Sequence, residues 1–150
     1  MANTQGMCLS FKRELLTATH VIGTDVLKIA LFNANAAGMQ PATTAAYATV
    51  ISSATEVSNS GTYAAGGSTV TFLAPADNAT TTAFTGPTSA STVSWTGFTA
   101  TNFDAALIYN SSKANKAVSI HTFSAQTITA GTFTITFPTN AAGTAMINLA

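Results

Sequence analysis

The chain has 150 residues, of which 47% are hydrophobic and only 7% are Asp, Glu, Lys or Arg. Ordinary soluble domains carry about 25% charged residues. Five basic and five acidic side chains give a formal net charge of +0, which excludes the clusters of Lys and Arg that bind nucleic acid or anionic membranes. We therefore expect one domain with a real core, no nucleic-acid partner and no membrane partner.

Ala, Thr, Ser, Gly and Asn take the place of the missing charges. These short side chains lose little conformational entropy when they are ordered, and a monomer without net charge has poor colloidal stability. The composition thus favours surfaces that pack against neighbouring subunits in a larger assembly. A general bias of the source toward small residues is the alternative explanation.

The N-terminal sequence MANTQGMCLS lacks a charged start followed by an apolar run, so no ordinary signal peptide is expected. No stretch approaches 18 consecutive apolar residues, so no membrane span is expected either. Cys8 is the only cysteine, which excludes an intrachain disulfide and fits folding in a reducing compartment. We predict that Cys8 is a buried small hydrophobe rather than a reactive thiol.

The first periodic segment, residues 10–20, predicts a short amphipathic helix. Ser10 is the expected N-cap, and Glu14 lies close to the capping-box position. Phe11, Leu15 and Leu16 are expected on its buried face. The preceding residues 1–9 mix apolar and polar side chains without charge, which predicts a flexible arm that gains order on a neighbouring subunit; a frayed end without a role is the alternative.

Several short apolar runs follow. Residues 26–32 are apolar on both faces and predict a central strand. Residues 47–52 and the alternating residues 68–73 predict further strands. Residues 77–90 are rich in Thr, Ser, Gly and Pro and predict a loop, and residues 92–95 predict a short strand ending at the only tryptophan.

The C-terminal third has the clearest strand pattern. Residues 104–110 and 117–123 flank the polar stretch 111–116, which predicts a hairpin. Residues 131–137 alternate Phe or Ile with Thr and end at a proline, and residues 145–150 predict a terminal strand. Seven or eight strands after one helix predict a mainly β fold: a single antiparallel β-sandwich or jelly-roll-like domain spanning residues 1–150, with one short N-terminal helix.

The apolar faces of these strands define the expected core. Ile135 lies in the middle of the most regular strand, so Ile135→Ala is expected to cost roughly 2–5 kcal/mol as a large-to-small core change. The residues expected to line the interior are Leu27, Ile29, Leu31, Phe72, Leu107, Ile120, Phe133, Ile135, Phe137 and Ile147.

Residues that could carry chemistry are few and dispersed. His20 is expected at a helix C-terminus and His121 within a strand, and two histidines with one distant cysteine do not make a zinc spacing. No GxSxG nucleophile motif and no GK[ST] phosphate loop is present. We therefore predict no catalytic residue, no cofactor and no metal. The acidic side chains are interpreted as solvent-exposed surface residues or helix and turn caps, with a catalytic carboxylate pair as the alternative. The acids are Glu14, Asp25, Glu56, Asp77 and Asp104.

Two further features have a plain and a functional interpretation. The triplets starting at Asn78 and Asn110 match the glycosylation pattern, and without a secretory signal the match is attributed to chance. Trp95 and Phe98 could form an exposed aromatic pair for sugars or partners, but core packing at the end of a strand is the preferred interpretation.

Five segments together resemble small virion proteins of tailed bacteriophages: SFKRELLTATH, DVLKIALF, EVSNSGTYAAGG, AALIYNSSKANKAV and GTFTITFPTNAAGTAMINLA. The likeness covers most of the chain in the same order, and its specificity is in this succession rather than in any chemical motif. Some such proteins resemble capsid decoration, or cement, proteins. The resemblance implies location on the capsid surface of a virion, the phage major capsid protein as partner, and a homo-oligomer, most simply a trimer that matches a local three-fold axis.

These observations lead to one expected function and three alternatives. The expectation is a non-enzymatic virion structural protein, a cement protein that stabilises the assembled shell by binding it. The first alternative is a phage tail or fibre module that contacts the host surface. A secreted carbohydrate-binding or adhesin sandwich and a hydrolase are further alternatives. The secreted sandwich is disfavoured because no signal peptide is expected, and the hydrolase is disfavoured because no catalytic site is predicted.

Overall fold

The computed structural model describes residues 2–34, 38–51, 56–79, 82–87 and 92–149. Strands hold 49% of the residues and helices 10%, so the predicted mainly β fold is confirmed. Two antiparallel sheets carry the structure, one with the strand order β1-β7-β6-β2-β3 and one with the order β4-β5-β8. The elements are β1 Gly6–Met7, α1 Leu9–Leu16, β2 Leu27–Asn33, α2 Tyr47–Ile51, β3 Ser68–Val70, β4 Ala76–Asp77, β5 Ala83–Thr85, β6 Thr92–Asn110, β7 Lys116–Thr136 and β8 Ile147–Leu149.

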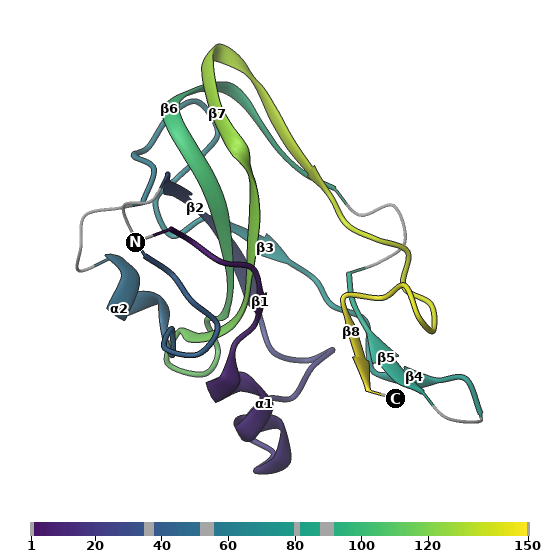
Figure 1. Cartoon of the computed structure of the whole chain (residues 1–150). Coiled ribbons are helices and arrows are strands. Elements are labelled where there is room, and N and C mark those ends of the chain that lie inside the picture. Colours follow the sequence, from purple (N-terminus) through teal and green to yellow (C-terminus); the bar gives the residue numbers. More distant parts are fainter. Residues whose placement is uncertain (1, 35–37, 52–55, 80–81, 88–91, 150) are drawn as a thin grey trace.

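A long, bent ladder formed by β6 and β7 connects the two sheets. Figure 1 shows the pair rising through the five-stranded sheet, folding over at the top and descending toward β4, β5 and β8. The molecule therefore has two limbs. The first limb is the five-stranded sheet with both helices, and the second limb is the three-stranded sheet with the descending ends of β6 and β7.

The bend is produced by a series of register shifts in the β6–β7 ladder. Gly97 (φ +60°), Asn102 (φ +54°) and Ala130 (φ +48°) take the left-handed conformation there. Extra unpaired residues bend a strand and increase its twist. We predicted separate strands over residues 92–95 and 104–110, and over residues 117–123 and 131–137; in the structure bulges join each pair into one strand.

The predicted hairpin between residues 104–110 and 117–123 is confirmed, with Ala106 opposite His121 and Ile108 opposite Ser119. Two other predictions are wrong. Residues 47–51 form the helix α2, because the Tyr47 ring stacks on Tyr109 at 4.5 Å and Val50 is buried on the same helical face. Part of the predicted loop 77–90 forms β5, which pairs with both β4 and β8; residues 52, 80–81 and 88–90 lie outside the described part.

The core confirms most of the expected interior residues. Eight of the ten are buried, whereas Phe133 and Ile135 are only partly buried, because both lie in the descending part of β7. Trp95 is 1% exposed and Phe98 is fully buried, which confirms core packing and excludes an exposed aromatic pair. Their rings join Tyr63, Phe103 and Phe133 in one cluster, in which Trp95 stacks on Phe133 at 6.0 Å.

The helix α1 differs from its prediction at both ends. Cys8, not Ser10, is the N-cap and makes no side-chain cap, so Glu14 has no capping-box role. The helix stops at Leu16 rather than residue 20, because Ala18 takes the left-handed conformation at φ +53°. The amides of Ala18 and Thr19 then bond to the carbonyls of Leu15 and Glu14, the pairing of a Schellman C-cap.

The expected N-terminal arm is bound to the domain rather than free. Asn3 donates to Asp104 Oδ1 at 2.7 Å and accepts from the Met39 amide at 2.9 Å. The Thr4 amide bonds to the Met39 carbonyl, and β1 pairs with β7. A short strand followed by a helix therefore fixes residues that the sequence alone suggests are loose.

Deleting residues 1–5 should consequently lower the melting temperature of the free protein. The deletion leaves Asp104 and the backbone of Met39 without their partners, and each lost hydrogen bond to a part-buried group costs about 1–3 kcal/mol. Calorimetry of the truncated chain and of Asn3→Ala measures this loss. Equal melting temperatures for the truncated and full-length chains would restore the flexible-arm interpretation.

Candidate functional site

The charged residues of the chain concentrate around α1. Six of the ten charged side chains lie on this helix, in the loop that follows it, or in the turn between β6 and β7 and the first residue of β7. They are Lys12, Arg13, Glu14, Asp25, Lys113 and Lys116. In a chain with so little charge, this concentration makes α1 and its surroundings the first candidate for a functional site.

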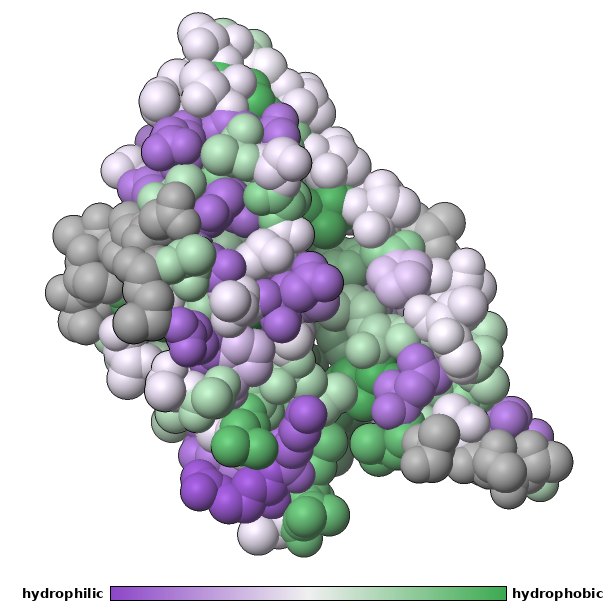
Figure 2. Space-filling model, in the orientation of Figure 1, coloured by the Kyte–Doolittle hydropathy of each residue, from purple (hydrophilic) through white to green (hydrophobic). Residues whose placement is uncertain are grey.

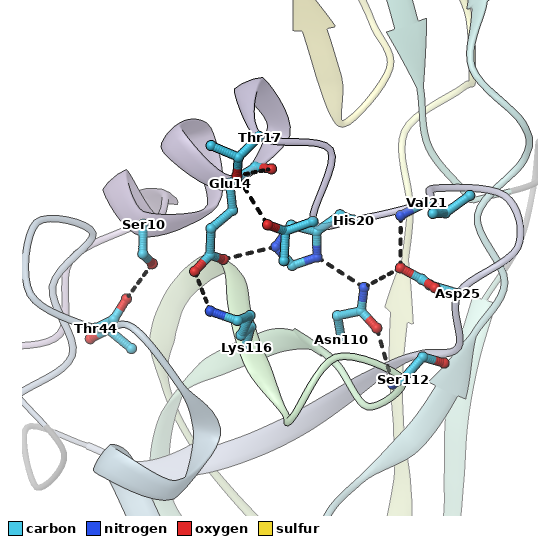
Figure 3. Close-up of polar contacts among 11 residues, drawn as sticks. Ser10, Glu14, Thr17, His20, Val21, Asp25, Thr44, Asn110, Ser112 and Lys116 are labelled. Carbon is cyan, nitrogen blue, oxygen red and sulfur yellow. Dashed lines mark hydrogen bonds and ion pairs between the residues drawn. The ribbon is translucent and has the colours of Figure 1, made fainter.

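Four of these six side chains link α1 and the loop after it to the β6–β7 turn: Glu14, Asp25, Lys113 and Lys116. Figure 3 shows Glu14 pointing from α1 toward the β6–β7 turn, where its carboxylate accepts hydrogen bonds from Lys116 and from His20 Nε2. The His20 bond is 2.9 Å long, and the His20 ring also packs on Phe11 at 4.7 Å. The interaction of Glu14 with Lys116 therefore links residues 102 positions apart in the chain.

Asn110 extends this network to Asp25. Its amide Nδ2 lies 2.9 Å from His20 Nδ1 and 2.7 Å from Asp25 Oδ2. An amide nitrogen donates, so His20 Nδ1 accepts and Nε2 carries the proton that Glu14 accepts. Asp25 also accepts from the Val21 amide at 2.8 Å and pairs with Lys113 at 3.6 Å. We call Glu14, His20, Asp25, Asn110 and Lys116 the anchor network.

The anchor network keeps its two carboxylates ionised. Burial opposes the charge on Glu14, but the hydrogen bonds from Lys116 and His20 and the positive charge of Lys116 outweigh it and lower the pKa of Glu14. Burial likewise opposes the charge on Asp25, whereas the Val21 amide, Asn110 and Lys113 lower its pKa. The network is thus an electrostatic attachment of α1 and the following loop to the β6–β7 turn.

The chemistry of the anchor network is structural. The His20 side chain has no exposed surface and that of Glu14 is 9% exposed, so the imidazole is inaccessible to a substrate. We predicted His20 as a charge at a helix end and Glu14 as surface or cap, and neither prediction anticipated this burial. Asn110, which matches a glycosylation triplet, is also fully buried, so its side chain is not available for modification.

Glu56, which forms a β-bridge with Phe32 of β2, has a similar structural role. Its carboxylate accepts from Tyr47 at 2.5 Å, from Tyr63 at 2.8 Å and from the Gly66 amide at 2.7 Å. Burial raises the pKa of Tyr109, which stacks on Tyr47, to about 12. Of the two remaining acids, Asp104 binds Asn3, and Asp77 accepts from a nearby backbone amide. In the described part of the chain, no group of three or more His, Cys, Asp or Glu side chains could hold a metal ion.

Cys8 and His121 are the other groups with potential reactivity. Cys8 is fully buried, and burial raises its pKa to about 12, which confirms the prediction of an unreactive small hydrophobe. His121 shares a 2.9 Å hydrogen bond with Ser119, and burial lowers its pKa. No carboxylate among the described residues contacts His121, so the pair lacks the group that orients the base in a nucleophilic triad.

His121 lies in a cleft between the two limbs. Figure 2 shows this hollow, with hydrophobic surface along its floor. The cleft contains a cavity of about 320 Å³. Its apolar walls come from both limbs and include Ile29, Phe123, Ile135, Phe137 and Met146. The half-burial of Ile135 follows from this position, because its side chain faces the cleft.

The outer face of α1 is apolar and cationic. Leu9 is 59% exposed and Leu16 is 90% exposed, and the exposed side chains of Lys12 and Arg13 lie between them. Figure 2 shows hydrophobic and hydrophilic patches side by side at this end of the molecule. The predicted burial of Leu16 is wrong, because Phe11 and Glu14 occupy the inward face and the helix ends at Leu16 itself.

Apolar depressions lie on both sides of α1. One has a volume of about 570 Å³ and runs between the helix and residues Ala42 and Ala45. The other, of about 410 Å³, separates Leu15 and Leu16 from Leu149 of β8. A helix with an exposed apolar face between two grooves is an arrangement that fits docking to another protein surface.

No helix in the described part of the chain is both long and apolar enough to cross a membrane. Comparison of the chain with protein-family models, with curated proteins and with solved structures finds no match.

Proposed function

We propose that this protein is a non-enzymatic structural component of a bacteriophage virion, a capsid decoration or cement protein that binds the assembled major capsid shell. The observation that carries the proposal is the outer face of α1, where Leu16 is 90% exposed on a helix held by the contacts of Glu14 with His20 and Lys116. A fixed, exposed apolar surface is typical of a site that binds another protein, and it fits a protein whose function is to pack against other subunits.

If the protein binds the assembled shell and not the free capsid subunits, it stabilises the shell. A ligand that binds an assembled state and not its free subunits shifts the assembly equilibrium toward that state by mass action. The engagement of Glu14, Asp25 and Glu56 in internal contacts supports a structural role over a hydrolytic one. In this proposal the protein is synthesised in the host cytoplasm and resides on the capsid surface.

The protein would decorate the shell as a homo-oligomer, most simply a trimer on a local three-fold axis. The near absence of free charge outside α1 supports contacts between copies that depend little on salt. The alternative, a tail or fibre module that contacts the host surface, depended on exposed aromatic side chains. It loses that support because Trp95 is 1% exposed.

Copy number tests the proposal. Purified particles should contain this protein in a number on the order of the capsid subunit number, since a closed lattice repeats each docking site. Quantitative densitometry of particle proteins measures the ratio to the major capsid protein. A handful of copies per particle would contradict the cement function and favour a tail component.

A further inference from the structure

We infer that α1 is the docking element, and that its partner is a protein surface carrying carboxylates between two apolar contact points. This inference rests on the proposed function, because it names the surface and the partner chemistry through which shell binding would occur. We call Leu9, Lys12, Arg13 and Leu16 the docking face.

The docking face is one continuous face of the helix. Its four residues are spaced i, i+3, i+4 and i+7, the positions that align along one side of an α-helix. The cations therefore lie in the middle, with a leucine at each end. Seven residues of helix rise about 10 Å, which sets the separation expected between the two apolar contact points on the partner.

Charge identifies the partner as acidic. Lys113 and Lys116 pair with Asp25 and Glu14, whereas Lys12 and Arg13 make no ion pair with any described residue and are exposed. Two adjacent unpaired cations are a large local excess in a chain with only five. Carboxylates on the partner would neutralise them at the rim of an apolar contact, and such pairs favour orientation and association rate.

The shape of the surface around α1 fits a protein partner rather than a membrane. Grooves of about 570 and 410 Å³ flank the helix, and ridges on a partner protein can fill them. Recognition of an anionic membrane surface ordinarily needs clusters of about 4–8 Lys or Arg, and the docking face supplies two.

The anchor network prepares this face for binding. Glu14 is held by Lys116 and His20 on the side of the helix opposite the docking face. Since α1 is already fixed, binding would not require ordering of the helix, and preorganisation of this kind retains affinity that ordering would otherwise cost.

The test measures cosedimentation of the purified protein with shells of the parent phage assembled without it. Arg13→Glu and Leu16→Ser should each weaken binding about tenfold, as expected for residues buried in the interface, and added salt should weaken binding of the unaltered protein. Lys28→Glu and Leu73→Ser are the matched controls, because they make an equivalent charge reversal and the same leucine-to-serine change away from α1 and should bind like the unaltered protein. Melting temperatures verify that all four variants fold.

Each contrary result has its own meaning. Unaltered binding by Arg13→Glu and Leu16→Ser would overturn this inference and leave the proposed function intact. Failure of the unaltered protein to bind shells would overturn both. A change from oligomer to monomer in Leu16→Ser, measured by light scattering, would instead assign the face to contacts between copies. Tighter binding to phosphatidylserine vesicles than to shells would assign it to a membrane.

Discussion

Replacing Trp95 with alanine should lower the free energy of unfolding by roughly 3–5 kcal/mol, the range for removing a buried aromatic side chain. The ring is 1% exposed and contacts Tyr63 and Phe133 at centroid distances of 5.5 and 6.0 Å. Its indole nitrogen donates to Ser68 at 2.8 Å, which ties the bent ladder to β3. The side chain therefore holds the ladder where it bends between the two limbs.

Urea denaturation followed by circular dichroism measures this effect, since fluorescence is lost with the only tryptophan. Trp95→Phe keeps an aromatic ring and loses the hydrogen bond to Ser68, so it should cost about 1–3 kcal/mol. The loss of unfolding free energy in Ile135→Ala should be smaller than the roughly 2–5 kcal/mol of a fully buried residue, because Ile135 is only partly buried beside the cleft. If the Trp95→Ala and Ile135→Ala variants were equally destabilised, the aromatic cluster around Trp95 would not contribute more to stability than the residues beside the cleft.

The sequence predicted local structure well where apolar runs are bounded by clear turn signals. The strand β2 and the β6–β7 hairpin were predicted because continuous apolar runs bounded by polar turn residues form buried strands there. Continuity of the long strands was not predicted. Gly97 and Asn102 are turn-forming residue types, and only the partner strand determines whether they end a strand or form a bulge within it.

The anchor network could not be predicted for a related reason. Glu14 and Lys116 are 102 residues apart, and His20 and Asn110 are 90 apart. Each has an ordinary local interpretation as a surface charge, a helix end or a strand end. Their contact depends on where α1 packs against the β6–β7 turn, and sequence periodicity carries no information about that packing. The exposure of Leu16 was missed in the same way, because the left-handed Ala18 that ends the helix has no distinctive residue type.

Breaking the anchor network from its cationic side should be costly. Lys116→Met leaves the carboxylate of Glu14 buried with His20 as its remaining partner, and removing one member of a buried ion pair costs about 3–5 kcal/mol. The lower end of that range is expected, because the Lys116 side chain is 35% exposed. Glu14→Leu combined with Lys116→Met removes both charges and should recover most of the loss. Chemical denaturation at neutral pH compares the single and double variants.

Acid should weaken the same contact in the unaltered protein. The pKa of Glu14 is lowered from 4.5 and that of Asp25 from 3.8, so the unfolded chain binds protons more readily than the folded chain. Their stabilisation is therefore fully present above a pH of about 4.5 and is lost as the pH falls through the lowered values. The double variant Glu14→Leu, Lys116→Met should have a shallower decline of stability in this window. An identical pH dependence in both proteins would mean that Glu14 is not held as an anion beneath α1, and that another contact fixes the helix.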